Sequence, residues 1–139
     1  MGDHRESFEF HATLTGLDEA LQTLHHSVDL LRAAARRPLD ERSLMLFETA
    51  LGEIGANVLT HGRPGGHHED VAYVLRFDGD RASASFTDRG PAVDDHLSRE
   101  MPEPLSESGR GLAMARALLD ELGYQRDGDL NTWRLVKKL

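Results

Sequence analysis

The positions of the hydrophobic residues predict a strand and a helix at the start of the chain. Residues 7–14, SFEFHATL, alternate apolar and polar side chains with the two-residue period of a half-buried strand. The next segment spaces its apolar residues by three and four, so a helix is expected to begin near Asp18 and to end before Pro38. Its apolar positions are Leu17, Leu21, Leu24, Val28 and Leu31.

A second helix is expected from about Leu39 to His61. Asp40 is suited to cap its first turn, because an aspartate side chain accepts hydrogen bonds from the unpaired amide groups there. The glycines and the proline within residues 62–66 end the helix. Its expected buried stripe consists of Leu44, Phe47, Leu51, Ile54 and Val58.

Two hairpin patterns, separated by a loop and a helix, fill the second half of the chain. Residues 70–90 hold two β-rich runs that meet at Asp78-Gly79-Asp80. The expected inward side chains of this hairpin are Val71, Tyr73, Leu75 and Phe77. Residues 91–108 mix prolines, charges and serines without an apolar face, which indicates a loop. Residues 111–122, GLAMARALLDEL, are helical in pattern, and a hairpin around Asp127-Gly128-Asp129 follows.

The expected order of elements is therefore β, α, α, β, β, loop, α, β, β. Helices should cover one face of a mixed or mostly antiparallel sheet, which makes the fold class α+β and the architecture a two-layer sandwich. A length of 139 residues suits one domain, 1–139, and leaves no room for a second domain of ordinary size.

Composition narrows the classes of partner. The chain has 16 Lys plus Arg against 24 Asp plus Glu, a formal charge of −8, so its average field repels nucleic acid and anionic lipid. There is no cysteine, which excludes disulfides and thiolate metal sites and favours a reducing cytosol. No segment is apolar enough for a signal peptide or a membrane span. We expect a soluble cytoplasmic protein that binds neither membrane nor nucleic acid directly.

The end of the second helix, GEIGANVLTHG, carries polar residues where core packing needs none. Glu53, Asn57 and His61 follow one another at intervals of four and share a ridge beside the apolar stripe. A carboxylate and a carboxamide at this spacing address one small space, which suits a site that binds a hard cation and handles a proton. The alternative is an ordinary solvated helix face, and His61 equally fits a packing role.

Two glycine-containing stretches favour the site. In FTDRGPA, Asp88 lies at the end of an expected strand and Gly90 follows, so a carboxylate is presented where a flat ligand can approach the backbone. In SGRGLAMARALLDEL, Gly109-Arg110-Gly111 leads into a helix, whose N-terminal amides and dipole favour phosphate. Taken singly, the first fits a plain turn, the second an ordinary loop, and Arg110 a solvated side chain.

The three motifs together, in this order, resemble the GHKL ATPase superfamily, and most closely its small anti-sigma-factor serine/threonine kinases. ALGEIGANVLTHG is similar to the N box, FTDRGPA to the first glycine box and SGRGLAMARALLDEL to the second. The similarity extends over nearly the whole chain. It implies the Bergerat, or histidine-kinase-type ATPase, fold, with a nucleotide pocket roofed by the loop at about 91–108.

The resemblance also implies roles for individual residues. Glu53 would act as the general base, and Asn57 would bind the Mg²⁺ that bridges the phosphates of ATP. Asp88 would accept a hydrogen bond from the adenine amino group, and Gly90 would let the base approach the backbone. The remaining cofactor-binding positions would be Gly109, Arg110 and Gly111 at the phosphates and Thr132, which would hold a water shared by Asp88 and the base.

The chain departs from the family pattern at Ala92, where relatives often have glycine. Gly52 and Gly55 lie in mid-helix, where each costs roughly 1 kcal/mol relative to alanine, and close approach by a neighbouring element would explain them. In the glycine-rich loop after the second helix, His67-His68-Glu69-Asp70 are an alternative, separate metal site. Adjacent histidines in such a loop are, however, more often solvated.

The resemblance implies an ATP-dependent protein serine/threonine kinase that acts as an anti-sigma factor. Its partners would be an anti-anti-sigma (STAS-type) protein, which it phosphorylates, and a sigma factor, which it sequesters, and it would be a homodimer. A non-catalytic ATP-binding module in a partner-switching pathway is the alternative, and a simple ATPase is a third hypothesis. Transfer of phosphate to an acceptor protein separates the kinase from the binding module, and release of phosphate without an acceptor indicates the simple ATPase.

Overall fold

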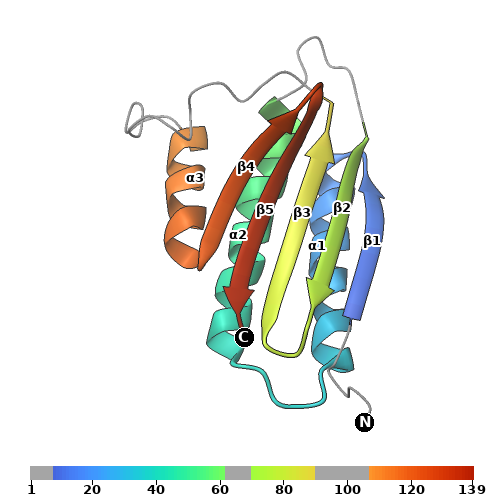
Figure 1. Ribbon diagram of the computed structural model, residues 1–139, viewed down its shortest axis with the longest axis vertical. Helices are drawn as coiled ribbons and strands as arrows, with labels where there is room; N and C mark the ends of the chain where they lie inside the picture. Colours follow the sequence, from blue (N-terminus) through green and yellow to red (C-terminus); the bar gives the residue numbers. More distant parts are fainter. Residues whose placement is uncertain (1–7, 62–69, 90–106) are drawn as a thin grey trace.

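A five-stranded sheet with helices on one face makes up the fold of this computed structural model, which describes residues 8–61, 70–89 and 107–139, with the backbone alone for residues 61 and 107–110. The elements are β1 (Phe8–Leu14), α1 (Leu17–Ala34), α2 (Glu41–His61), β2 (Val71–Phe77), β3 (Arg81–Asp88), α3 (Glu107–Leu118), β4 (Glu121–Asp127) and β5 (Leu130–Lys138). Helices α1 and α2 lie behind the sheet in Figure 1, and α3 lies beside β4. The predicted order and the α+β two-layer architecture are confirmed.

Every strand pairs with its neighbours in the antiparallel sense. The order across the sheet is β1-β2-β3-β5-β4, so β5 is inserted between β3 and β4. Consecutive strands form the hairpins β2–β3 and β4–β5, as the two Asp-Gly-Asp sequences predict. The central pair, β3 and β5, therefore joins the two halves of the chain.

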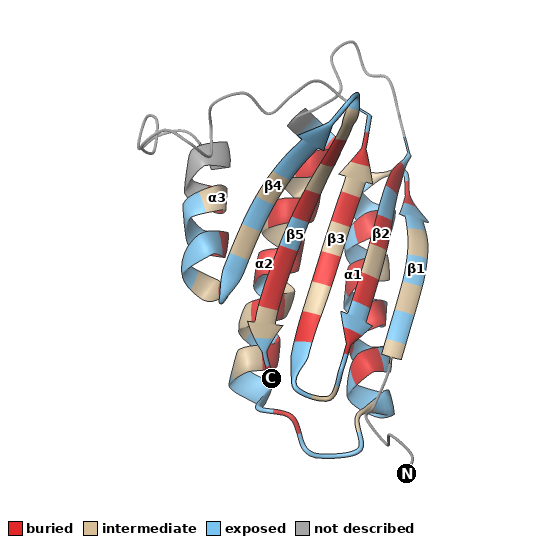
Figure 2. Ribbon diagram, viewed as in Figure 1, coloured by how far each residue is buried: buried red, intermediate tan, exposed pale blue. Residues whose placement is uncertain are grey.

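The two faces of the sheet differ in composition. Side chains alternate along each strand, and the helix-covered face carries the buried ones, as Figure 2 shows by its bands of red. The predicted inward residues Val71, Tyr73, Leu75 and Phe77 are all buried. On β3 the buried set is Ala82, Ala84, Phe86 and Asp88. A carboxylate thus ends a row of otherwise apolar side chains.

Helix α2 has the predicted cap and the predicted stripe. Asp40 Oδ1 accepts from the Arg42 amide at 3.1 Å and Oδ2 from the Ser43 hydroxyl at 3.0 Å, which satisfies donors of the first turn. Leu44, Phe47, Leu51, Ile54 and Val58 are all buried. In α1 the pattern is less regular, because Leu17 and Leu21 are exposed while Ala20 and Ser27 are buried.

The two mid-helix glycines of α2 have different environments. A Cβ at Gly55 would lie 3.0 Å from Leu24 Cδ1 and 3.4 Å from Phe86 Cε1, so close packing against α1 and β3 explains this glycine. A Cβ at Gly52 would make only an ordinary contact, 3.9 Å from Leu21 Cδ2. Close approach by a neighbouring element is therefore confirmed at Gly55 and not at Gly52.

A buried polar pair also joins α1 to the sheet. Ser27 Oγ donates to the Leu24 carbonyl at 2.7 Å and lies 2.8 Å from Tyr73 Oη. Since the serine hydroxyl has one hydrogen, which it gives to the carbonyl, the tyrosine donates to Ser27 Oγ. Burial raises the pKa of Tyr73, so the phenol stays protonated and remains a donor.

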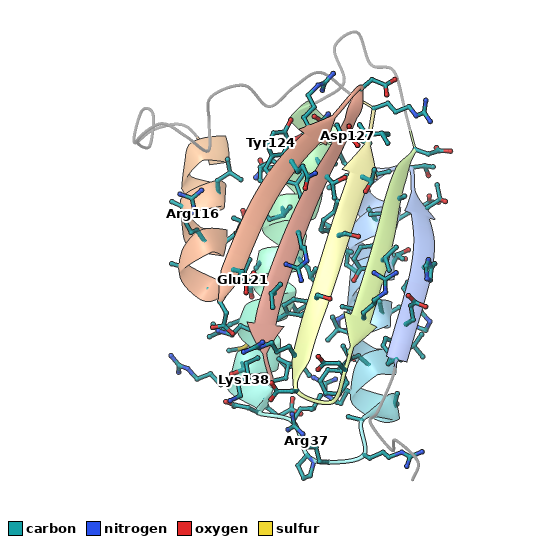
Figure 3. The ribbon with its side chains drawn as sticks, viewed as in Figure 1. Arg37, Arg116, Glu121, Tyr124, Asp127 and Lys138 are labelled. Atoms are coloured by element: carbon teal, nitrogen blue, oxygen red, sulfur yellow. The ribbon has the colours of Figure 1, made fainter. Side chains whose placement is uncertain are left out.

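The turns of the two hairpins lie at opposite ends of the sheet, and both use glycine. Gly79 (φ 97°) and Gly128 (φ 65°) adopt the left-handed conformation that hairpin turns require. Arg37, labelled in Figure 3, lies on the connection between α1 and α2 and donates to the Gly79 carbonyl through Nη2 at 2.8 Å. Asp78 Oδ1 accepts from the amides of Asp80 and Arg81, each at 2.8 Å.

The helix predicted over residues 111–122 has different bounds in the structure. It spans Glu107–Leu118, and β4 already begins at Glu121. The Asp120 amide donates to the Val136 carbonyl at 2.9 Å, so pairing with β5 overrides a leucine spacing that also suits a helix. Of the predicted loop at 91–108, residues 91–106 lie outside the described part. None of the helices in the described segments is long and apolar enough to cross a membrane.

Candidate functional site

The polar ridge of α2 faces α3. A Cβ built on Gly111 of α3 would lie 2.7 Å from Glu53 Oε1 and 3.5 Å from Asn57 Nδ2. The carboxylate of Glu53 and the carboxamide of Asn57 thus both approach Gly111. The glycine has no Cβ, which leaves room for these two groups. Both side chains are half-buried, so they are accessible to a ligand while their positions are restricted.

The second glycine motif lies within the helix. Because α3 begins at Glu107, Gly109 and Arg110 belong to its first turn and Gly111 follows them, whereas the sequence pattern places them ahead of the helix. The first four amides of a helix lack partners within the helix, so the backbone of residues 107–110 offers donors suited to phosphate oxygens. This end of α3 lies next to the glutamate and asparagine of α2.

Asp88, at the end of β3, is held by a polar network. It is 9% exposed, and its Oδ1 accepts from Asn131 Nδ2 at 3.0 Å. Asn131, the residue opposite it on β5, accepts in turn through Oδ1 from Tyr124 Oη at 2.5 Å and from Arg126 Nη1 at 2.9 Å. Three strands therefore contribute to the surroundings of one carboxylate.

The register moves one predicted residue out of the site. Thr132 pairs with Thr87, and their hydroxyl oxygens lie 3.3 Å apart. Neighbouring residues of a strand point to opposite faces, so Thr132 lies on the open face, where it lines a hollow with Gln125 and Arg134. The expectation that Thr132 shares a water with Asp88 does not fit this register, and Asn131 occupies the position beside the carboxylate.

Helix α2 connects the two groups of residues. Gly55 packs on Phe86, which lies two residues before Asp88 on the same face of β3, while Glu53 and Asn57 line the side of α2 that faces α3. The second half of α2 therefore contacts both β3, near its end, and α3, near its start. This arrangement offers a buried acceptor at one end and a carboxylate, a carboxamide and helix amides at the other.

The donor set suits magnesium better than a metal held by protein alone. In the segments with described side chains, no three histidine or acidic residues gather into a metal site. Mg²⁺ usually keeps water ligands and binds through one or two protein oxygens together with phosphates. Asn57, with Glu53 beside it at the same glycine of α3, fits that requirement.

A hollow of about 480 Å³ lies at the strand ends. It is lined by Thr13, Asp70, Ala72, Thr87, Asp88, Arg89 and Leu130. Thr13, Ala72 and Thr87 form one row across the open face of the sheet, so this hollow is on the side away from α2. It reaches Asp88 from the edge of the sheet and is distinct from the space beside Gly111.

Several predicted site residues lie outside the described part of the chain. These are Gly90, Ala92, the side chains of His61 and Arg110, and His67, His68 and Glu69 of the alternative metal site. Asp70, the last member of that alternative site, is exposed.

Sequence reasoning missed Asn131, Tyr124 and Arg126. A two-residue turn at Gly128-Asp129 would have paired Arg126 with Asn131 from the hairpin sequence alone. The alignment of β5 with β3 carries no comparable local signal, because those strands are far apart in the chain.

Comparison with known proteins supports the fold. The sequence profile described as the histidine kinase-like ATPase domain matches residues 15–137. The structure of the RsbU and RsbW domains of Rv1364c from Mycobacterium tuberculosis is similar, with a TM-score of 0.64 and 21% identity over 95% of this chain and 32% of that one. The chain therefore spans about a third of the length of that protein.

A second solved structure shares the fold over nearly its full length. The catalytic domain of the histidine kinase ThkA matches with a TM-score of 0.57 and 10% identity, over 93% of this chain and 95% of that one. No curated protein matches the sequence at a significant level.

Proposed function

Because the chain belongs to the histidine kinase-like ATPase domain family, we propose that it binds ATP with Mg²⁺ and transfers the γ-phosphate to a serine or threonine hydroxyl of a partner protein. The observation that carries this proposal is the convergence of Glu53 and Asn57 on Gly111. This convergence supports the proposal, because it brings a carboxylate, which can act as a base, and a carboxamide, which can bind a metal, beside the first turns of α3.

Each residue of the site has a distinct role in this proposal. Asp88 accepts from the exocyclic amino group of adenine, and the backbone at Gly109 to Gly111 binds the phosphates. Asn57 binds Mg²⁺, and the bound ion neutralises negative charge on the phosphate oxygens. Glu53 accepts the proton of the acceptor hydroxyl. The hydroxyl oxygen bonds to the γ-phosphorus as the bond to the β–γ bridging oxygen breaks, and ADP leaves.

The partner side of the proposal follows the motif resemblance. We assign the chain to the anti-sigma-factor kinases of the cytoplasm, which phosphorylate an anti-anti-sigma protein, sequester a sigma factor and act as homodimers. The RsbW domain of Rv1364c, which has the same fold, supports this subfamily. The net charge of −8 suits a basic surface on such a partner.

The test is transfer of label from γ-labelled Mg-ATP to a candidate STAS-type protein carrying a serine. We expect the wild-type chain to label it. Glu53→Ala should lose at least about 100-fold in transfer with Mg-ATP affinity changed by less than about threefold, whereas Asn57→Ala should weaken binding itself by at least about tenfold. Thr49→Ala is the matched control, because Thr49 is exposed on the same helix and its hydroxyl donates to the Met45 carbonyl of that helix.

The outcomes separate the three hypotheses. Nucleotide binding without labelling of any acceptor supports a non-catalytic binding module in partner switching. Release of phosphate without an acceptor supports a simple ATPase. Normal transfer in both site variants contradicts the assigned roles.

A further inference from the structure

Asn131 is a buried amide whose orientation is fixed by its neighbours. It is 1% exposed, and both groups bonded to its Oδ1, the Tyr124 hydroxyl and the Arg126 guanidinium, are donors. A guanidinium can only donate, so the atom facing it must be the oxygen of the amide. The amide nitrogen is then the atom that faces Asp88, and the bond between them runs from Asn131 Nδ2 to Asp88 Oδ1.

The network also polarises the hydrogen bond that Asn131 donates to the Asp88 carboxylate. Hydrogen bonds in a chain polarise one another, and the guanidinium of Arg126 draws electron density from the amide oxygen of Asn131. The amide nitrogen becomes a stronger donor as a result. Tyr124, which Figure 3 labels on β4, adds a second donor and packs on Trp133 with ring centroids 5.0 Å apart, so its position is restricted.

We propose that Asn131 is a positioning residue that keeps Asp88 an acceptor and thereby sets the base selectivity of the site. This inference rests on the proposed binding of ATP. The bond from Asn131 fixes the orientation of the Asp88 side chain, and a carboxylate has two oxygens with about four acceptor positions between them. Asp88 then favours a base that offers an N–H, as adenine does with its amino group. Guanine has a carbonyl oxygen in place of the adenine amino group, so two acceptors, this oxygen and the Asp88 carboxylate, would face each other.

The decisive measurement compares ATP with purine riboside triphosphate, which lacks only the amino group. The ratio of their dissociation constants, each with Mg²⁺, reports the contact with Asp88 alone. We expect the wild-type chain to favour ATP by at least about 30-fold, because a site that hydrogen-bonds a ligand group rejects the analogue without it. GTP, measured in parallel, should bind more weakly still.

Asn131→Asp is the most informative variant, because it preserves shape. The new carboxylate still accepts from Tyr124 and Arg126 but cannot donate to Asp88. We expect the ratio to fall to about threefold or less at neutral pH, because the two adjacent carboxylates repel each other and Asp88 loses the bond that holds it in position.

Two further variants keep the inference falsifiable if the buried substitution fails to fold. Arg126→Met removes one donor to Asn131 at an exposed position of β4 and should lower the ratio by about two- to fivefold. Gln125→Met changes the adjacent residue of β4, which is exposed on the open face, and should leave the ratio unchanged. Circular dichroism verifies that each variant is folded.

The outcomes distinguish this inference from the function on which it rests. A ratio that falls in Asn131→Asp and Arg126→Met but not in Gln125→Met supports the assigned role. Equal loss of affinity for both nucleotides, with the ratio unchanged, identifies a purely structural tie between strands and overturns the inference alone. Absence of nucleotide binding by the wild-type chain overturns the inference together with the proposed function.

Discussion

Gly111 lies so close to Glu53 that a methyl group on its α carbon would stand 2.7 Å from Oε1. That distance is far below van der Waals contact, so one of the two groups would have to move. The obstructed atom is the end of a flexible side chain, and Glu53 would therefore move while the backbone stayed in place. The glycine at position 111 therefore allows the observed position of the Glu53 carboxylate and is not required for the stability of the fold.

Gly111→Ala should therefore separate activity from stability. Alanine favours the interior of a helix by roughly 1 kcal/mol over glycine, so we expect the free energy of unfolding to stay within about 1 kcal/mol of wild type. Displacement of Glu53 should lower phosphate transfer by at least about tenfold. Denaturant unfolding and the label-transfer assay measure the two effects, and full activity would show that the contact has no bearing on catalysis.

Gly52→Ala is the matched control, one residue from Glu53. Its Cβ would meet only Leu21 Cδ2, at 3.9 Å. We expect the stability to rise by about 0.5–1 kcal/mol while transfer stays unchanged. Loss of activity in this variant would indicate that any change in α2 disturbs the site.

Gly55→Ala should have the opposite effect on stability. Its Cβ would lie 3.0 Å from Leu24 and 3.4 Å from Phe86, so the helix must move away from the sheet or the leucine must change position. Overpacking of this kind costs typically about 1–3 kcal/mol, against the helix gain of roughly 1 kcal/mol. We expect Gly55→Ala to be less stable than Gly52→Ala by at least about 1 kcal/mol in urea unfolding, and equal stability would contradict the close packing.

Substitutions in the buried pair of Ser27 and Tyr73 should have unequal costs. Ser27→Ala leaves the tyrosine hydroxyl as a buried donor without its acceptor, at a cost of about 1–3 kcal/mol. Tyr73→Phe removes that donor, while Ser27 still donates to the Leu24 carbonyl, and should cost less. The double variant should cost less than the sum of the single ones, and simple additivity would show that the two hydroxyls are not coupled.

The pairing of His25 with Glu48 predicts a dependence of stability on pH. The hydrogen bond to Glu48 raises the pKa of His25 above its ordinary value of 6.5, and Asp29 adds to the effect while Arg32 opposes it. A raised pKa in the folded state means that the protonated form favours folding. The contribution is complete below about pH 6.5 and disappears as the pH rises through the raised value.

Thermal unfolding at about pH 6 and about pH 9 tests this dependence. The wild-type melting temperature should fall more between these values than that of Glu48→Gln, which lacks the charged partner. His25 is exposed, so the difference should be small and should shrink further at high salt. Identical pH dependence in the two proteins would refute the contribution of this pair.

Local patterns in the sequence account for most of the fold. The stripe of α2 and its cap at Asp40 depend on spacing and side-chain chemistry within a few residues, and both were predictable. The boundary near Asp120 was not, because the leucines at 118, 119 and 122 suit a helix as well as a strand until β5 pairs with this segment. The N-box ridge was likewise predictable, whereas its contact with Gly111 depends on how α2 packs against α3.

Register explains the remaining difference at the site. Alternation along β5 assigns Asn131 to the buried face with Trp133 and Leu135, and Thr132 to the open face, but the register decides which residue of β3 each of them meets. The alignment of β5 with β3 is set by packing at positions such as Phe86 and Trp133, which face each other 47 residues apart in the chain (133 − 86 = 47). Such long-range pairing has no local signal.

The insertion of β5 between β3 and β4 has a consequence for biosynthesis. Asp88 receives its partner Asn131 only from a strand that spans Leu130–Lys138, and β4 joins the sheet only through that strand. A nascent polypeptide whose residue 138 is still inside the ribosome holds both glycine motifs but lacks the strand that contacts Asp88. Under the proposed function, nucleotide can therefore stabilise this domain only after β5 has emerged from the ribosome.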